Sequence, residues 1–177
     1  VIYQLSGNHR MAYEQCKSLV ALFEGNENYT FLKNNYDSYC SALLNLNMHE
    51  GFFAQAKLFD STSGKLNSLM EKRPEFKQLF FPMTFINRSI LMDRTGNHDK
   101  TSMLVKEFQE ELERFKGETR KEAIIVMYIN FACLFFSSQN YKEALRWLNK
   151  IINDSSSKNF REDLYCVAMI LNLIINY

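Results

Sequence analysis

Asparagines recur at a nearly constant interval along this chain of 177 residues. Asn45, Asn87, Asn130 and Asn172 are 42, 43 and 42 residues apart, and each follows Leu or Ile. A side-chain amide offers both a hydrogen-bond donor and an acceptor, so a row of such amides can bind a peptide backbone without reading its sequence. The alternative is that the row reflects packing or coincidence, because Asn is common throughout the chain.

Turn signals recur at a similar interval. Gly7, Gly51 and Gly96 are 44 and 45 residues apart, and Gln139 follows 43 residues later with Asn140 behind it. Glycine favours the positive φ that ends a helix, and a following Asn can cap the next helix. We therefore expect hairpin turns near residues 7–9, 51–53, 96–98 and 139–141, with a capping box at Asn140 and Glu143.

The segments beside these turns have the spacing of amphipathic helices. The chain contains only 6 Gly and 2 Pro, too few turn residues for an all-β fold. Pro74 suits the first turn of a helix, and Pro82 either kinks that helix or begins a second one. The pattern predicts one all-α domain over residues 1–177, a right-handed α-solenoid of about four antiparallel helical hairpins with a period of about 44 residues.

In such a solenoid the asparagines fall in the first helix of each hairpin, where they face the groove. Their predicted neighbours in this groove are Ile86, Ile90, Ile129 and Cys133. The candidate peptide-binding site therefore combines a row of amides with a small number of apolar side chains.

The fourth predicted hairpin resembles the tetratricopeptide-like superfamily. The residues that carry the resemblance are Tyr128, Phe131, Ala132 and Phe135 in the first helix and Tyr141, Ala144, Leu148 and Ile151 around and after the turn. The usual repeat is about 34 residues, shorter than the period here. The resemblance implies a superhelix whose inner groove, lined by first helices, binds extended peptides or partner helices. Residues 141–177 also resemble the tail of uncharacterised helical-repeat proteins of Bacteroidetes-type bacteria, for which no activity is known.

No motif for catalysis, cofactor binding or metal binding is present. Walker-type loops, G-x-S-x-G and H-E-x-x-H are absent, so we expect neither an enzyme nor a cofactor. His9, His49 and His98 lack metal-ligand spacing, and we expect packing roles near the turns. A net charge of +1 argues against binding to nucleic acid.

The chain has no segment expected to cross a membrane. Its most apolar stretch, residues 123–136, falls short of the roughly 18 residues that a span needs. The four cysteines have no C-x-x-C spacing and are expected to be reduced, which favours a cytoplasmic location.

These observations favour a non-catalytic scaffold that binds a protein or peptide in its groove. A peptide-sensing domain of a bacterial regulator, a structural spacer and part of an enzyme with a separate catalytic domain are the alternatives. The start at Val1 and the end at Tyr177, within an apolar run, suggest a piece of a longer chain. Neither the partner nor the oligomeric state is indicated by the sequence.

Overall fold

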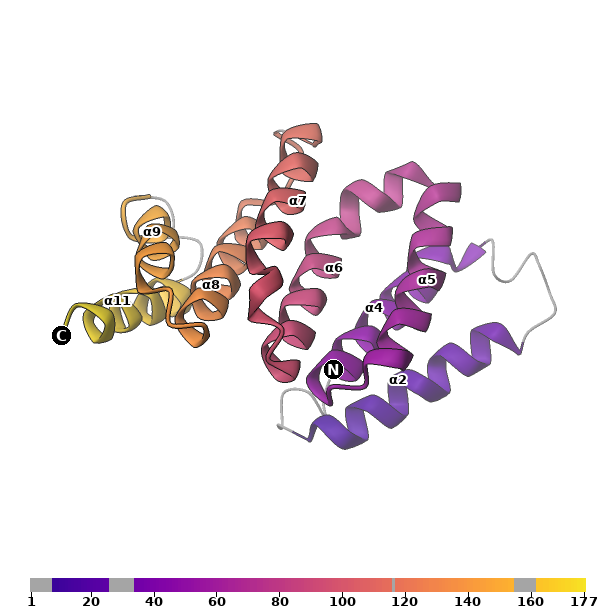
Figure 1. Ribbon diagram of the computed structural model, residues 1–177. Helices are drawn as coiled ribbons and strands as arrows, with labels where there is room; N and C mark the ends of the chain where they lie inside the picture. The colour runs from indigo at the N-terminus through magenta and orange to yellow at the C-terminus, as the bar shows by residue number, and fades with distance from the viewer. Residues whose placement is uncertain (1–7, 26–33, 116, 155–161) are drawn as a thin grey trace. The chain divides into compact units, whose positions relative to one another are not determined.

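The computed structural model describes residues 8–25, 34–115, 117–154 and 162–177. These residues form helices and turns without a β-strand, which confirms the all-α prediction. The elements in Figure 1 are α2 (His9–Glu24), α4 (Tyr36–Phe52), α5 (Ala56–Lys72), α6 (Pro74–Thr95), the short 3₁₀ helix η1 (His98–Lys100), α7 (Thr101–Arg114), α8 (Lys121–Ser137), α9 (Tyr141–Ile152) and α11 (Glu162–Asn176). No helix in these ranges is long and apolar enough to cross a membrane.

The chain divides into two compact units, Val1–Lys77 and Gln78–Tyr177. In the first unit, α4 packs against both α2 and α5. In the second unit, α8 packs against α7, α9 and α11, and α9 also packs against α11. Helices that follow one another along the chain are thus neighbours in space within each unit. The single helical-repeat domain over residues 1–177 stays a prediction.

The turns that follow α4, α6 and α8 share one geometry. One residue in each turn has a positive φ, namely Ala54 (56°), Gly96 (70°) and Gln139 (61°). The next residue donates its backbone N–H to the carbonyl five residues earlier, in the pairs Gln55–Glu50, Asn97–Met92 and Asn140–Phe135, at 2.8, 3.0 and 2.8 Å. This is the Schellman motif, which satisfies carbonyls left open at a helix end. The positive-φ residues are 42 and 43 residues apart.

The prediction that Gly51 supplies a turn is wrong. Gly51 is buried inside α4, and the positive φ falls three residues later on Ala54. The backbone hydrogen bonds hold this turn, so Ala tolerates the left-handed conformation at a cost of about 1–2 kcal/mol. The turns predicted at 96–98 and 139–141 coincide with the positive φ of Gly96 and Gln139. Part of the turn expected at 7–9 lies outside the described residues.

Asparagine caps α2 and α9 as predicted, but the reciprocal half of the capping box at α9 does not form, because the Asn140 N–H donates to the Phe135 carbonyl and the Glu143 carboxylate pairs with Arg146. The side chain of Asn8 accepts a hydrogen bond from the backbone N–H of Met11 at 3.1 Å, and that of Asn140 accepts one from Glu143 at 3.4 Å. Asn97 does not act in this way. Its Nδ2 donates to Thr95 Oγ1 at 2.9 Å, and η1 precedes α7.

Both prolines lie in α6. Pro74 is the first residue of the helix, where a missing backbone N–H costs nothing. Pro82 lies inside the helix, which continues to Thr95, so Pro82 does not begin a second helix.

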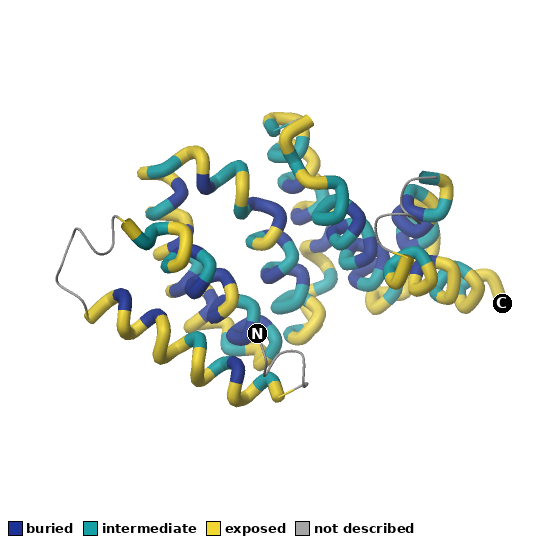
Figure 2. The backbone as a smooth tube through the Cα atoms, turned by 180° about the vertical axis from the view of Figure 1, so that it is seen from behind, coloured by how far each residue is buried: buried dark blue, intermediate teal, exposed yellow. Residues whose placement is uncertain are grey.

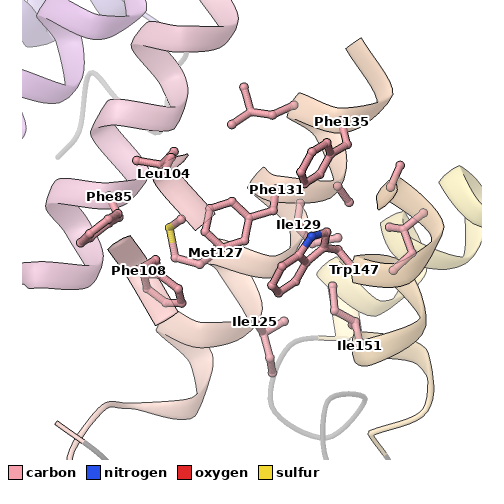
Figure 3. Close-up of a cluster of buried hydrophobic side chains, with 14 of the residues drawn as sticks. Phe85, Leu104, Phe108, Ile125, Met127, Ile129, Phe131, Phe135, Trp147 and Ile151 are labelled. Carbon is pink, nitrogen blue, oxygen red and sulfur yellow. The ribbon is translucent and has the colours of Figure 1, made fainter. Parts of the chain in front are cut away.

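A chain of aromatic rings runs through the core of the second unit. The ring of Phe108 in α7 lies 5.4 Å from that of Phe85 in α6 and 5.5 Å from that of Phe131 in α8, centroid to centroid. The ring of Phe131 in turn lies 5.0 Å from that of Trp147 in α9. Figure 3 shows these side chains together in the buried cluster. The rings therefore connect α6, α7, α8 and α9 through direct contacts.

The first unit places polar side chains in its interior. Asn47, His49, Glu50 and Thr62 are all buried. Asn47 Nδ2 donates to the carbonyl of Phe59 at 3.0 Å, and Thr62 Oγ1 donates to Glu50 Oε1 at 3.1 Å. These hydrogen bonds join α4 to α5 and offset the cost of burying the polar groups.

Candidate functional site

The turns supply a common register for the predicted row of asparagines. Asn45, Asn87 and Asn130 each precede the positive-φ residue of the following turn, Ala54, Gly96 or Gln139, by nine residues. A register based on Gly51 places Asn45 three positions away from its counterparts. The position of Ala54 removes that offset, so these asparagines occupy equivalent positions in α4, α6 and α8.

Asn130 joins α8 to α6. Its Nδ2 donates to the Val126 carbonyl of the preceding helical turn at 2.8 Å, and its Oδ1 accepts a hydrogen bond from Ser89 Oγ at 3.1 Å. Ser89 is buried, whereas Asn130 keeps part of its surface exposed. The amide is thereby fixed in orientation at the edge of the core. An amide held in this way retains capacity for one further donor and one further acceptor contact.

The other three asparagines differ in their surroundings. Asn87 is fully buried, so its side chain is not presented to solvent. Asn45 is exposed, and its Nδ2 donates to the Ser41 carbonyl at 2.8 Å. Asn172 is half-buried and donates to Asn149 Oδ1 of α9 at 3.3 Å. Within the second unit, the structure therefore joins Asn130 to α6 and Asn172 to α9.

The predicted apolar neighbours lie at the margin of the core. Ile86, Ile90 and Cys133 are half-buried, and Ile129 is buried within the core cluster. Burial raises the pKa of the Cys133 thiol, and the carboxylate of Asp93 raises it further. A raised pKa leaves the thiol protonated and poorly nucleophilic at neutral pH. Cys133 therefore acts here as a small apolar side chain.

Sequence reasoning missed the polar residues of α6 that meet α8. Ser89 bonds to Asn130, and Ser137 Oγ of α8 donates to Asp93 Oδ1 at 3.2 Å. Ser89 carried no distinct signal of its own, because it follows two other polar residues, Asn87 and Arg88. The partner on α8 depends on helix packing and has no local signal either.

The histidines near the turns have packing contacts in the first unit. The ring of His9 stacks on Phe52 with a centroid distance of 4.3 Å and lies 6.0 Å from the ring of His49. Across the described ranges, no group of three or more His, Cys, Asp or Glu side chains is placed to hold a metal ion.

We expect acid to destabilise the first unit through His49. This side chain is fully buried, and burial, followed by the neighbouring His9, lowers its pKa. An unfolded histidine titrates near pH 6.5, so below about pH 6.5 the unfolded chain binds more protons than the folded chain. The contribution of His49 to stability is therefore present above about pH 6.5 and is lost as the pH falls toward the folded pKa.

Glu50 has the opposite effect on the pH dependence of stability. Burial raises the pKa of its carboxyl group, so this group favours the folded state on acidification. The variant His49→Gln separates the two groups, since it retains Glu50. Urea unfolding followed by circular dichroism should show a smaller loss of stability on acidification in His49→Gln than in the wild type. Equal pH dependence in the wild type and His49→Gln would contradict the assignment.

No protein-family model, curated protein or solved structure matches the chain. The tetratricopeptide-like resemblance therefore rests on the residues of this chain, and so does any functional conclusion.

Proposed function

We propose that this chain is a non-catalytic module that binds a protein or an extended peptide. In this proposal its helical hairpins form a right-handed α-solenoid of the tetratricopeptide-like kind, with a period of about 43 residues. The observation that supports it most is the shared register of Asn45, Asn87 and Asn130, each nine residues before a turn of the same geometry. Of these three amides, Asn45 and Asn130 reach the surface, where an amide can exchange hydrogen bonds with a peptide backbone, and Asn87 is buried.

The binding surface in this proposal lies where α6 meets α8, and we call it the Asn130 face. It consists of Ile86, Ile90, Asn130 and Cys133, all half-buried. The apolar side chains supply contact area, and the oriented amide of Asn130 exchanges hydrogen bonds with a peptide backbone. Asn45 offers an exposed amide at the equivalent position of the first unit.

Asn87 and Ile129 have a supporting role in this proposal. Both are buried, so neither side chain is accessible to a ligand. Their side chains instead hold α6 and α8 in position beside the exposed part of Asn130. The predicted row thus separates into side chains that contact a ligand and side chains that position them.

The test uses peptides selected from a displayed random library against the folded chain. Asn130→Ala should raise their dissociation constants about five- to tenfold, which corresponds to the loss of one or two hydrogen bonds. Asn67→Ala, a change at an exposed asparagine of α5, is the matched control and should leave binding unchanged.

If the Asn130 amide binds the peptide backbone, binding of the same peptides should also depend on their backbone N–H groups. Methylation of the peptide nitrogen that meets Asn130 should weaken binding to the wild type and have little further effect on Asn130→Ala. Circular dichroism checks that each variant folds. Equal affinity of the peptides for Asn130→Ala and the wild type would contradict the proposal that the Asn130 face is the binding surface.

A further inference from the structure

One side of α11 is apolar and exposed. Val167, Met169, Ile170, Leu173 and Ile174 project from this side, with Leu173 66% and Ile170 58% exposed. The opposite side packs against the core of the second unit through Leu164, Tyr165, Ala168, Leu171 and Ile175. Figure 2 shows most of α11 in the colour of exposed residues. No charged residue occurs between 164 and 177, so the outer face presents an uninterrupted apolar stripe.

The outer face of α11 corresponds to the face of α8 that α9 covers. Asn172 follows Asn130 by 42 residues, and the same shift aligns Ile170 with Tyr128 and Leu173 with Phe131. In α8 these aromatic residues contact Trp147 of α9, at ring distances of 5.2 and 5.0 Å. Val167 and Ile174 align in the same way with Ile125 and Ala132, both buried. The stripe on α11 therefore has the composition and register of a surface that receives a helix.

Charged residues at the start of α11 indicate which charge the C-terminal end of a helix bound on this face should carry. Lys121, the first residue of α8, lies 2.9 Å from Asp154, which comes just after the end of α9. The residue of α11 that aligns with Lys121 is Asp163, and the acidic Glu162 precedes it. In the first unit, Arg73 after α5 similarly lies over the ring of Tyr36 at the start of α4, at 5.2 Å. The end of the second helix of a hairpin thus meets the start of the first helix, and the described residues at the start of α11 are the acidic Glu162 and Asp163.

We propose that the outer face of α11 binds an antiparallel amphipathic helix whose apolar stripe resembles that of α9 and whose C-terminal end is basic. The apolar stripe fills the positions that Trp147 and its neighbours fill on α8. The basic end pairs with the carboxylates of Glu162 and Asp163. The charges are the reverse of those in the Lys121–Asp154 pair, in which the first helix carries the cation and the second helix is followed by the carboxylate. A second copy of α9 is excluded as the preferred occupant, because its Asp154 would face two carboxylates. This surface is separate from the Asn130 face, and the proposal stands independently of the function proposed above.

Two labelled peptides test the proposal by fluorescence anisotropy with the full 177-residue chain. One peptide has the sequence of residues 139–154, and the other carries Asp154→Lys. The lysine peptide should bind about fivefold more tightly at low salt, and the preference should shrink as salt is added. In the protein, the double variant Glu162→Lys, Asp163→Lys should reverse the preference.

Leu173→Glu should weaken both peptides at least about tenfold, because it places a charge in the centre of the apolar stripe. Leu22→Glu is the matched control, since Leu22 is a 71% exposed leucine on α2, and it should leave binding unchanged. Both substitutions are at exposed sites, and circular dichroism checks the fold. Failure of both peptides to bind, equal binding of the two peptides, or equal binding to wild type and Leu173→Glu would overturn the proposal. So would concentration-dependent self-association that Leu173→Glu abolishes, because a second copy would then be the occupant.

Discussion

Phe108→Ala is expected to destabilise the second unit by about 3–5 kcal/mol, the range for removal of a fully buried aromatic side chain. The ring of Phe108 is inaccessible to solvent and lies within 5.9 Å of Phe81, 5.4 Å of Phe85 and 5.5 Å of Phe131. Its removal leaves a cavity where α6, α7 and α8 meet. Because these contacts come from two other helices, α6 and α8, relaxation of one helix cannot fill the space.

The measurement is urea unfolding followed by the fluorescence of Trp147, the only tryptophan of the chain and a residue of the second unit. Met103→Ala is the control, because Met103 belongs to the same helix and is 55% exposed. It should cost less than about 1 kcal/mol. The double variant Phe108→Ala, Phe131→Ala should cost less than the sum of the single changes, since the two rings share a contact. A loss below about 1 kcal/mol for Phe108→Ala would contradict the packing of this ring cluster.

Ala144→Leu is expected to cost about 2–3 kcal/mol through overpacking. Ala144 in α9 and Ala132 in α8 are both buried in the cluster where these helices pack together. They lie five residues after and seven residues before the positive-φ residue Gln139. Small residues at such a pair of positions allow two helices to approach closely, and a leucine has no room without a shift of the backbone.

In the first unit, the residues seven before and five after the positive-φ residue Ala54 are Asn47 and Phe59. Both are buried, and the amide of Asn47 donates to the Phe59 carbonyl at 3.0 Å. A large side chain is therefore accommodated when the hairpin forms around it, but not when it is inserted into a core that is already packed around Ala132 and Ala144. Lys142→Leu, at an exposed site two residues earlier, is the control and should change stability by less than about 0.5 kcal/mol. If Ala144→Leu unfolds at the same urea concentration as this control, the close approach of α8 and α9 is contradicted.

Helix type and approximate position were predictable from sequence, because both depend on local patterns. The apolar spacing before and after Gln139 predicts α8 and α9, and Asn140 caps α9 as its sequence context indicates. The turn at Gly96 followed from the intrinsic tolerance of glycine for positive φ. These features involve residues within one or two turns of each other and need no tertiary information.

The turn after α4 illustrates where local rules fail. A glycine was present at position 51, yet the chain places its positive φ on Ala54. The end of α4 is set by backbone hydrogen bonds, and the buried Gly51 lies inside the helix. Only the observed turn shows that Asn45 shares its register with Asn87 and Asn130.

The sequence by itself determined an all-helical chain with asparagines at a regular interval, because helical periodicity, capping and spacing are written in neighbouring residues. The tertiary structure alone decided that Asn87 is buried, that Asn130 bonds to Ser89, and that the outer side of α11 stays exposed. The last two depend on which helices meet, and residues 41 positions apart carry no local signal of their contact. The free energy that selects those contacts comes from burial summed over whole helix faces, which no single residue pattern specifies.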